Sequence, residues 1–113
     1  MKSKQFEIWL ADLSPRFGTE PGKTRPVLVV QSGLLNQVHP STIVCPITSN
    51  VRKGVSILRV NLDKTQGGLK KESAVMIDQV RAIDNKRLIK KIGDLPKGLE
   101  DAVKENLKIV MDL

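Results

Sequence analysis

Residues 20–32 read EPGKTRPVLVVQS and join a turn rich in Pro and Gly to an apolar, β-branched run. The run Val27 to Val30 has the length and composition expected of a buried strand. Arg25 stands at the entrance to this strand. Because Pro26 disfavours the helical region for the residue before it, we expect Arg25 to be extended and its guanidinium to be fixed at the mouth of the loop. Function is therefore expected at this point of the chain.

Working outward, the remaining pattern predicts several short strands and one helix. Alternating apolar residues indicate strands over 6–13, 42–48 and 55–62, and further apolar segments over 73–77, 80–83 and 86–92. Residues 32–37 could hold one helical turn capped by Ser32. After Pro96, apolar residues recur at spacings of three and four, with acidic residues in the first turn, which predicts a C-terminal amphipathic helix. We expect a small, mainly antiparallel barrel or sheet with this helix packed on it.

Length and charge narrow the class of protein. The chain has 113 residues, enough for one domain with one core, and we expect residues 1–113 to form it. Its formal charge of +7, from 19 Lys and Arg against 12 Asp and Glu, favours a nucleic acid or an acidic protein as partner. The first residues do not resemble a signal peptide, and no apolar run has the length expected of a membrane-spanning segment. The one cysteine, Cys45, is expected to be a buried apolar residue. A reducing cytoplasm is the expected compartment.

The residue inventory excludes several kinds of site. His39 is the single histidine and lies in a polar loop, so a pair of catalytic histidines is impossible within one chain. With one His and one Cys, the usual zinc ligand sets cannot form, and the acids Glu20, Asp63 and Asp78 fall in separate loops. Only three aromatic residues exist, too few for a multi-base stacking platform. A mechanism without metal or other cofactor is therefore favoured.

Polar residues at predicted strand ends remain as candidates for chemistry. Cleavage of RNA by its own 2′-hydroxyl needs a proton acceptor, a proton donor and hydrogen-bond donors for the charge on phosphorus. Arg25, Thr48 and an acid could supply these groups. Each also has a structural interpretation: Arg25 as a surface ion pair, Thr48 as a turn residue and Asp78 as a turn former. The residues by themselves leave both interpretations open.

Four segments together resemble a known family. They are GTEPGKTRPVLVV at 18–30, VCPITS at 44–49, GLKKES at 68–73 and DQVRAID at 78–84. In order and spacing they are similar to the MazF/PemK family of toxin endoribonucleases from bacterial toxin–antitoxin pairs. The opening IWLADLSP at 8–15 and the terminal helix also fit, so the resemblance covers nearly the whole chain.

The resemblance implies a fold, an activity and partners. The fold would be a small SH3-like barrel with helices added, assembled as a homodimer. The activity would be cleavage of single-stranded RNA at a short sequence without metal, leaving a 2′,3′-cyclic phosphate and a 5′-hydroxyl. A cognate acidic antitoxin would bind the basic loops around Arg52-Lys53 and Lys70-Lys71 and exclude RNA.

The resemblance also implies site residues. Arg25 and Thr48 match the catalytic pair of the family, and Glu20 and Asp78 match acids that contribute to catalysis or substrate contact in some members. The expected RNA contacts are Phe17, Thr24, Ser49, Lys53 and Gln79. Met76 stands where some relatives carry an arginine two residues before the Asp.

Two alternatives from other classes of protein remain open at this point. One is a gyrase poison of similar fold, a protein binder for which a C-terminal aromatic anchor is expected; this chain ends Met111-Asp112-Leu113. The other is an RNA-binding barrel without activity, which needs the basic loops but not the pair of Arg25 and Thr48. Cleavage of RNA separates both alternatives from a nuclease.

Overall fold

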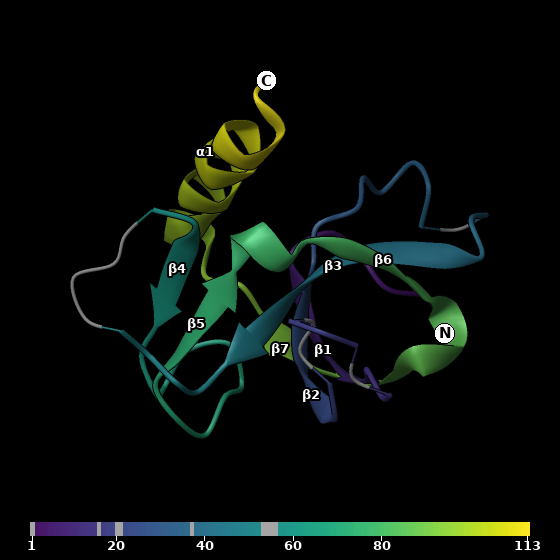
Figure 1. The fold of residues 1–113 in the computed structure, drawn as a ribbon, viewed down its shortest axis with the longest axis horizontal. Coiled ribbons are helices and arrows are strands. Elements are labelled where there is room, and N and C mark those ends of the chain that lie inside the picture. The colour runs from purple at the N-terminus through teal and green to yellow at the C-terminus, as the bar shows by residue number, and fades with distance from the viewer. Residues whose placement is uncertain (1, 16, 20–21, 37, 53–56) are drawn as a thin grey trace.

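Seven strands and a C-terminal helix make up the computed structural model, which describes residues 2–15, 17–19, 22–36, 38–52 and 57–113. The strands, in chain order, are β1 Glu7–Asp12, β2 Thr24–Val29, β3 Ser41–Thr48, β4 Arg59–Leu62, β5 Ser73–Met76, β6 Arg81–Asp84 and β7 Leu88–Asp94. Short 3₁₀ turns η1 Ile77–Gln79, η2 Asn85–Arg87 and η3 Lys97–Leu99 precede β6, β7 and the helix α1 Glu100–Met111. In Figure 1, α1 lies at one end of the molecule, beyond β4 and β5.

The strands form one antiparallel sheet in the order β4-β5-β3-β2-β1-β7, with β6 also paired to β3. The strands β4 and β7 are its two ends, so the described strands make an open sheet, and the expected barrel is a loose description of it. The mainly β fold with a C-terminal helix is confirmed. Because β3 pairs with β2, β5 and β6, it connects the β4–β5 pair to the rest of the sheet.

Both faces of the central strands are buried, which explains the continuous apolar run that begins at Val27. Leu28 belongs to a core shared with Val103 of α1, whereas Val27 and Val29 belong to a second core around Trp9. Neighbouring residues of a strand point to opposite faces, so a strand covered on both sides needs apolar residues at every position. The extended conformation expected for Arg25 is also confirmed, because β2 begins at Thr24.

The fourth strand differs from its prediction. It begins at Arg59 rather than at residue 55, and residues 53–56 lie outside the described part of the chain. Leu58 has a φ of +65°, a value that interrupts a strand. Its backbone N–H donates to Oδ1 of Asn106 on α1 at 2.6 Å. A tertiary contact with the helix therefore ends the apolar alternation that the sequence carries through Ile57 and Leu58.

The helix and the lone cysteine follow their predictions. Residues 97–99 form a 3₁₀ turn after Pro96, and α1 then carries Glu100 and Asp101 in its first turn. Cys45 is fully buried in β3, and burial, together with the charge of Asp78, raises the pKa of its thiol to about 12.

In the part of the chain that the structure describes, no helix is long and apolar enough to cross a membrane.

Candidate active site

A cavity of about 510 Å³ opens where the ends of β2 and β3 meet the segment between β4 and β5. These strand ends and the segment between β4 and β5 lie in the lower part of Figure 1. The floor of the cavity is apolar and comes from adjacent strands, whereas the rim of the cavity is polar and basic. The described lining residues are Leu10, Thr24, Arg25, Pro26, Ile47, Thr48, Ser49, Gly68, Leu69, Lys70, Lys71, Ser73, Lys90 and Ile92.

Strand register brings Arg25 and Thr48 together although they are far apart in the sequence. In the β2–β3 ladder, Val27 lies opposite Pro46 and Leu28 opposite Cys45. Continuing this register by two residues places Arg25 opposite Thr48, and both line the cavity. The two residues that the resemblance pairs are thus held by neighbouring strands of a buried sheet, not by mobile loops.

Local hydrogen bonds orient both side chains. Nε of Arg25 donates to the carbonyl oxygen of Gly22 at 3.0 Å, and the side chain is half-buried. This bond fixes the plane of the guanidinium at the rim. Oγ1 of Thr48 accepts from the backbone N–H of Asn50 at 3.1 Å. Because a hydroxyl is donor and acceptor at once, that arrangement lets the Thr48 proton point to a group in the cavity.

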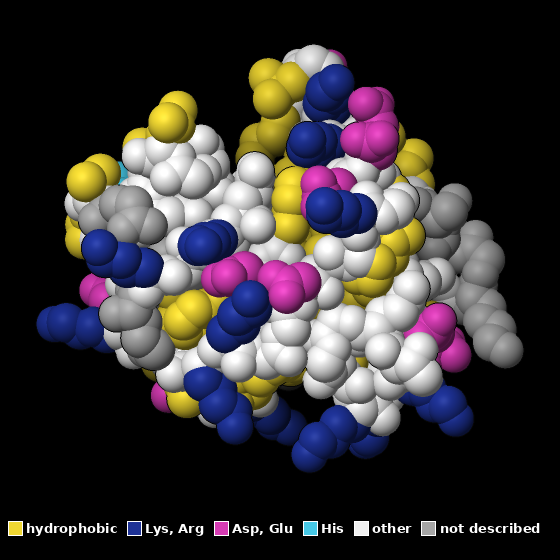
Figure 2. All heavy atoms as spheres, turned by 180° about the vertical axis from the view of Figure 1, so that it is seen from behind, with side chains coloured by type: hydrophobic (Ala, Val, Ile, Leu, Met, Phe, Trp, Pro, Cys, Tyr) yellow, Lys and Arg dark blue, Asp and Glu magenta, His cyan; other side chains and the backbone are white. Residues whose placement is uncertain are grey.

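The charge of the cavity is positive. Arg25, Lys70, Lys71 and Lys90 line it, and no Asp or Glu is among its described lining residues. Figure 2 shows Lys and Arg side chains along the lower edge of the molecule. Four cations around one concave site attract a polyanion, and a planar guanidinium beside a hydroxyl suits the oxygen atoms of a phosphodiester. The arrangement can bind a phosphate and stabilise negative charge on it.

Close backbone packing holds the basic segment against β7. A Cβ atom built on Gly68 would overlap the carbonyl group of Ile92, and one built on Gly93 would overlap the backbone of Gly67. Gly67 and Gly68 also have φ values of +68° and +75°, which side chains rarely tolerate. Only glycine fits at this contact. The contact places Leu69, Lys70 and Lys71 on the cavity rim.

Several predicted site residues lie elsewhere. Thr24 and Ser49 line the cavity with Arg25 and Thr48, but Asp78, Gln79 and Phe17 are not among its described lining residues. Asp78 is exposed in η1, which packs between β3 and α1, and Phe17 is 76% exposed. Glu20 and Lys53 lie outside the described residues, so their roles stay predictions.

Four other positions bear on the predictions. Met76 is buried in β5, and His39 is exposed, with Nδ1 at 3.3 Å from the backbone N–H of Ser41. Lys90 and Ser73 line the cavity although neither was predicted as a site residue. The sequence did contain a signal for the role of Lys90, because its basic side chain interrupts an otherwise apolar alternation in residues 88–92. Among the described residues, no three His, Cys, Asp or Glu side chains are grouped to hold a metal ion.

Comparison with known proteins places the chain in a family. Residues 4–111 match the model of the PemK-like, MazF-like toxins of type II toxin–antitoxin systems. The chain is 37% identical over 110 residues to Endoribonuclease EndoA of Bacillus subtilis, covering 97% of this chain and 95% of that relative.

Two solved structures agree with this result. The Mycobacterium tuberculosis toxin MazF-mt6 is 30% identical, with a TM-score of 0.79 over 95% of this chain and 97% of that one. A crystal structure of MazF from Deinococcus radiodurans, 24% identical, has the same fold, with a TM-score of 0.85 over 100% and 99% of the two chains. The chain therefore belongs to the PemK-like, MazF-like family of toxins of type II toxin–antitoxin systems.

Proposed function

We propose that this endoribonuclease toxin cleaves single-stranded RNA inside the cationic cavity, through the 2′-hydroxyl of the RNA itself. The observation that carries the proposal is the convergence of Arg25 and Thr48, opposite each other on β2 and β3, at a cavity whose described rim is basic and free of acids. A phosphodiester fits such a site, and the transition state of its cleavage gains negative charge that the site can stabilise.

The reaction requires no external nucleophile. The 2′-oxygen attacks phosphorus and loses its proton to a base, the bond from phosphorus to the 5′-oxygen breaks, and an acid gives that oxygen a proton. The products are a 2′,3′-cyclic phosphate and a 5′-hydroxyl. Arg25 acts by stabilising charge on the phosphate oxygens, because a guanidinium with a pKa above 12 is a poor proton carrier. Thr48 donates a hydrogen bond to the same phosphate.

The proton carriers and base contacts are proposed on the resemblance. Glu20 and Asp78 match acids that contribute to catalysis or substrate contact in some relatives; Asp78 is exposed in η1, outside the described cavity lining, and Glu20 lies outside the described residues. Thr24 and Ser49, on the cavity rim, are positioned to contact nucleotides beside the cleaved one. Phe17, Lys53 and Gln79 would extend the contact beyond the cavity, by stacking, charge and reading of base edges respectively.

The decisive experiment is incubation of the pure protein with a long single-stranded RNA in EDTA. We expect discrete fragments that carry 5′-hydroxyl ends, and mapping those ends gives the recognition sequence. A gyrase poison or a binding barrel would leave the RNA intact. Intact RNA with wild-type protein, or cleavage that stops in EDTA and returns with magnesium, would contradict the proposed mechanism.

The basic surface also supports a protein partner. An acidic antitoxin segment, disordered when free, would fold along Arg52-Lys53 and Lys70-Lys71 and reach toward Arg25. RNA and antitoxin would then exclude each other, and a reducing cytoplasm would be the compartment where both are found. A complex saturated with antitoxin that still cleaves RNA at the free rate would contradict this arrangement.

A homodimer is the assembly that we propose. The cavity of one 113-residue chain is lined by one copy of the basic segments, whereas two copies about a twofold axis would form a longer groove with the basic loops of both. Light scattering at micromolar concentration should give twice the mass of one chain. A single-chain mass would contradict the dimer without affecting the assignment of the cavity.

A further inference from the structure

Lys90 belongs to the cavity although it comes from the far edge of the sheet. It lies on β7 opposite Leu10 of β1, and both residues line the cavity. Lys70 and Lys71 reach the same rim from the segment between β4 and β5. These three lysines stand apart in the sequence from Arg25 and Thr48. They form a second cationic wall, here called the lysine wall and defined as Lys70, Lys71 and Lys90.

The backbone of β7 is irregular around Lys90. In the ladder with β1, Trp9 lies opposite Lys91 while Ile8 lies opposite Gly93, so one residue of β7 is unpaired there. A second irregularity follows between Leu10 and Ala11. Bulges of this kind redirect side chains and are frequent beside functional sites. Lys90 and Lys91 are the two paired residues between these irregularities.

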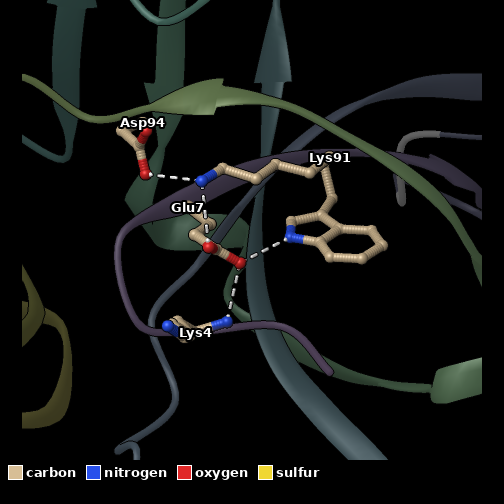
Figure 3. Close-up of polar contacts among 5 residues, drawn as sticks. Lys4, Glu7, Lys91 and Asp94 are labelled. Carbon is tan, nitrogen blue, oxygen red and sulfur yellow. Dashed lines mark hydrogen bonds and ion pairs between the residues drawn. The ribbon is translucent and has the colours of Figure 1, made fainter. Parts of the chain in front are cut away.

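Lys91 is held by two carboxylates, as Figure 3 shows. Its Nζ lies 3.1 Å from Oε2 of Glu7 and 3.2 Å from Oδ1 of Asp94. Glu7 is buried, and its Oε1 accepts from the indole Nε1 of Trp9 at 3.0 Å and from the backbone N–H of Lys4 at 2.8 Å. Three partners, Trp9, Lys4 and Lys91, therefore hold the Glu7 carboxylate, and Asp94 is a second acidic partner of Lys91.

Lys91, the anchored residue, directly follows Lys90, which lines the cavity, in β7. Successive residues of a strand point to opposite faces, so holding Lys91 against Glu7 directs Lys90 to the cavity side. On the other side of Lys91, Ile92 lines the cavity and Gly93 packs against Gly67. The ion pair between Lys91 and the buried carboxylate of Glu7 thus lies directly beside the residues of β7 that line the cavity.

We propose that the lysine wall binds a backbone phosphate of the RNA next to the cleaved one, and that Glu7 is a positioning residue that acts through Lys91 to place Lys90. The ligand class is a single-stranded polyanion, so the inference rests on the proposed function. Arg25 and Thr48 then hold the reacting phosphate, while the wall holds its neighbour and fixes the direction of the strand. Lys90 contributes to binding and not to chemistry.

The test uses a short RNA across the mapped cleavage site, with a 2′-deoxy nucleotide at the cleaved position so that it binds without reacting. Lys90→Gln should weaken binding roughly threefold at 0.15 M salt and lower the salt slope of log Kd by about 0.7, the value for one phosphate contact on a single strand. The matched control is Lys86→Gln, which removes the same charge from η2, outside the described cavity lining. The control should leave both quantities unchanged.

Positioning is tested by a double-mutant cycle. Glu7→Gln should weaken binding in the wild-type background and add nothing in the Lys90→Gln background, because both changes remove the same contact. Should Glu7→Gln fail to fold, Lys91→Gln breaks the same ion pair from its exposed side. Equal losses in both backgrounds would overturn the positioning role, and an unchanged slope for Lys90→Gln would overturn the lysine wall.

These failures are distinct from failure of the proposed function. If wild-type protein does not cleave the all-ribose version of the same oligonucleotide, the nuclease mechanism is wrong. If it cleaves normally and Lys90→Gln binds with the affinity and salt slope of wild type, only the lysine wall is wrong. A loss of slope in Lys86→Gln as large as in Lys90→Gln would show that net charge, not this wall, governs binding.

Discussion

The two ends of β3 carry similar polar residues with different uses. At its C-terminal end, Thr48 and the following Ser49 line the cavity together with cationic side chains. At its N-terminal end, Thr42 is buried and its Oγ1 donates to Oδ1 of Asn85 at 2.5 Å. Side chains at the C-terminal end of β3 face a cavity, whereas those at the N-terminal end bind to each other.

The pairing at the N-terminal end is extensive. Nε2 of Gln31 donates to Oδ1 of Asn36 at 2.8 Å, and Oε1 of Gln31 accepts from the backbone N–H of Ile43 at 3.2 Å. Nδ2 of Asn85 donates to the carbonyl oxygen of His39 at 2.8 Å. Buried polar groups bonded in this way hold the chain in one conformation. Polar residues that bond to each other in the interior are structural, whereas residues that face a cavity are candidates for function even where a local hydrogen bond orients them.

The largest expected effect is at the cavity end. Arg25→Ala should lower the rate of RNA cleavage by a hundredfold or more, on the order of 3 kcal/mol, because charge on the phosphate loses its stabilisation. Binding of RNA should stay measurable. Arg25→Lys should not restore the rate, since a point charge does not reproduce the planar fork.

Single-turnover kinetics on the mapped RNA measure this effect. The control is Lys86→Ala, which removes a positive charge outside the described cavity lining and should keep the wild-type rate. Near-normal cleavage by Arg25→Ala would remove Arg25 from the active site.

The next effect concerns the glycine contact that holds the lysine segment. Gly93→Ala should destabilise the protein by about 2 kcal/mol, the usual size of an overpacking penalty, because its Cβ would overlap the backbone of Gly67. Cleavage should fall as well, since the segment forms one wall of the cavity. Gly98→Ala is the matched control, with nothing within 4 Å of its added Cβ. Urea unfolding of the two variants checks this, and equal stabilities would argue against the close contact.

At the N-terminal end of β3 we expect a loss of stability without a loss of chemistry. Gln31→Leu should cost about 2 kcal/mol, because Asn36 and the backbone N–H of Ile43 lose a buried partner. The cleavage rate per folded molecule should match wild type. Thermal unfolding and kinetics below the transition measure the two quantities. A lowered rate in fully folded protein would extend the functional region to this end and break the comparison.

The smallest effect is the pH dependence contributed by Glu7. Burial raises its pKa, but the bonds from Trp9, Lys4 and Lys91 outweigh burial and hold the pKa below its ordinary value of 4.5. A carboxylate whose pKa is lowered by folding stabilises the folded state at pH values above its pKa in the unfolded state. That stabilisation is lost as the pH falls through its pKa in the folded state. Urea unfolding should therefore show wild type and Glu7→Gln farther apart at pH 7 than below pH 4. A difference that is constant with pH would contradict the ion pair as its source.

Local sequence was sufficient for most of the elements. Alternation and β-branching placed β1, β2 and β3, and the spacing of apolar residues after Pro96 placed α1, because these signals act over a few residues. The fourth strand was the exception. Its start depends on the hydrogen bond from Leu58 to Asn106, 48 positions along the chain, which no local pattern encodes.

The cavity, too, was determined partly by local sequence and partly by tertiary structure. Sequence by itself determined the charge of the protein, the extended conformation of Arg25 before Pro26 and the family motifs that include Arg25 and Thr48. The tertiary structure alone decided which residues meet them: Lys90 was brought in by β7, Lys70 and Lys71 by packing of Gly68 on that strand, while Asp78 was left in η1 outside the described lining. The physical reason is that side-chain periodicity fixes elements locally, whereas strand order, bulges and backbone contacts between distant segments fix what those elements bring together.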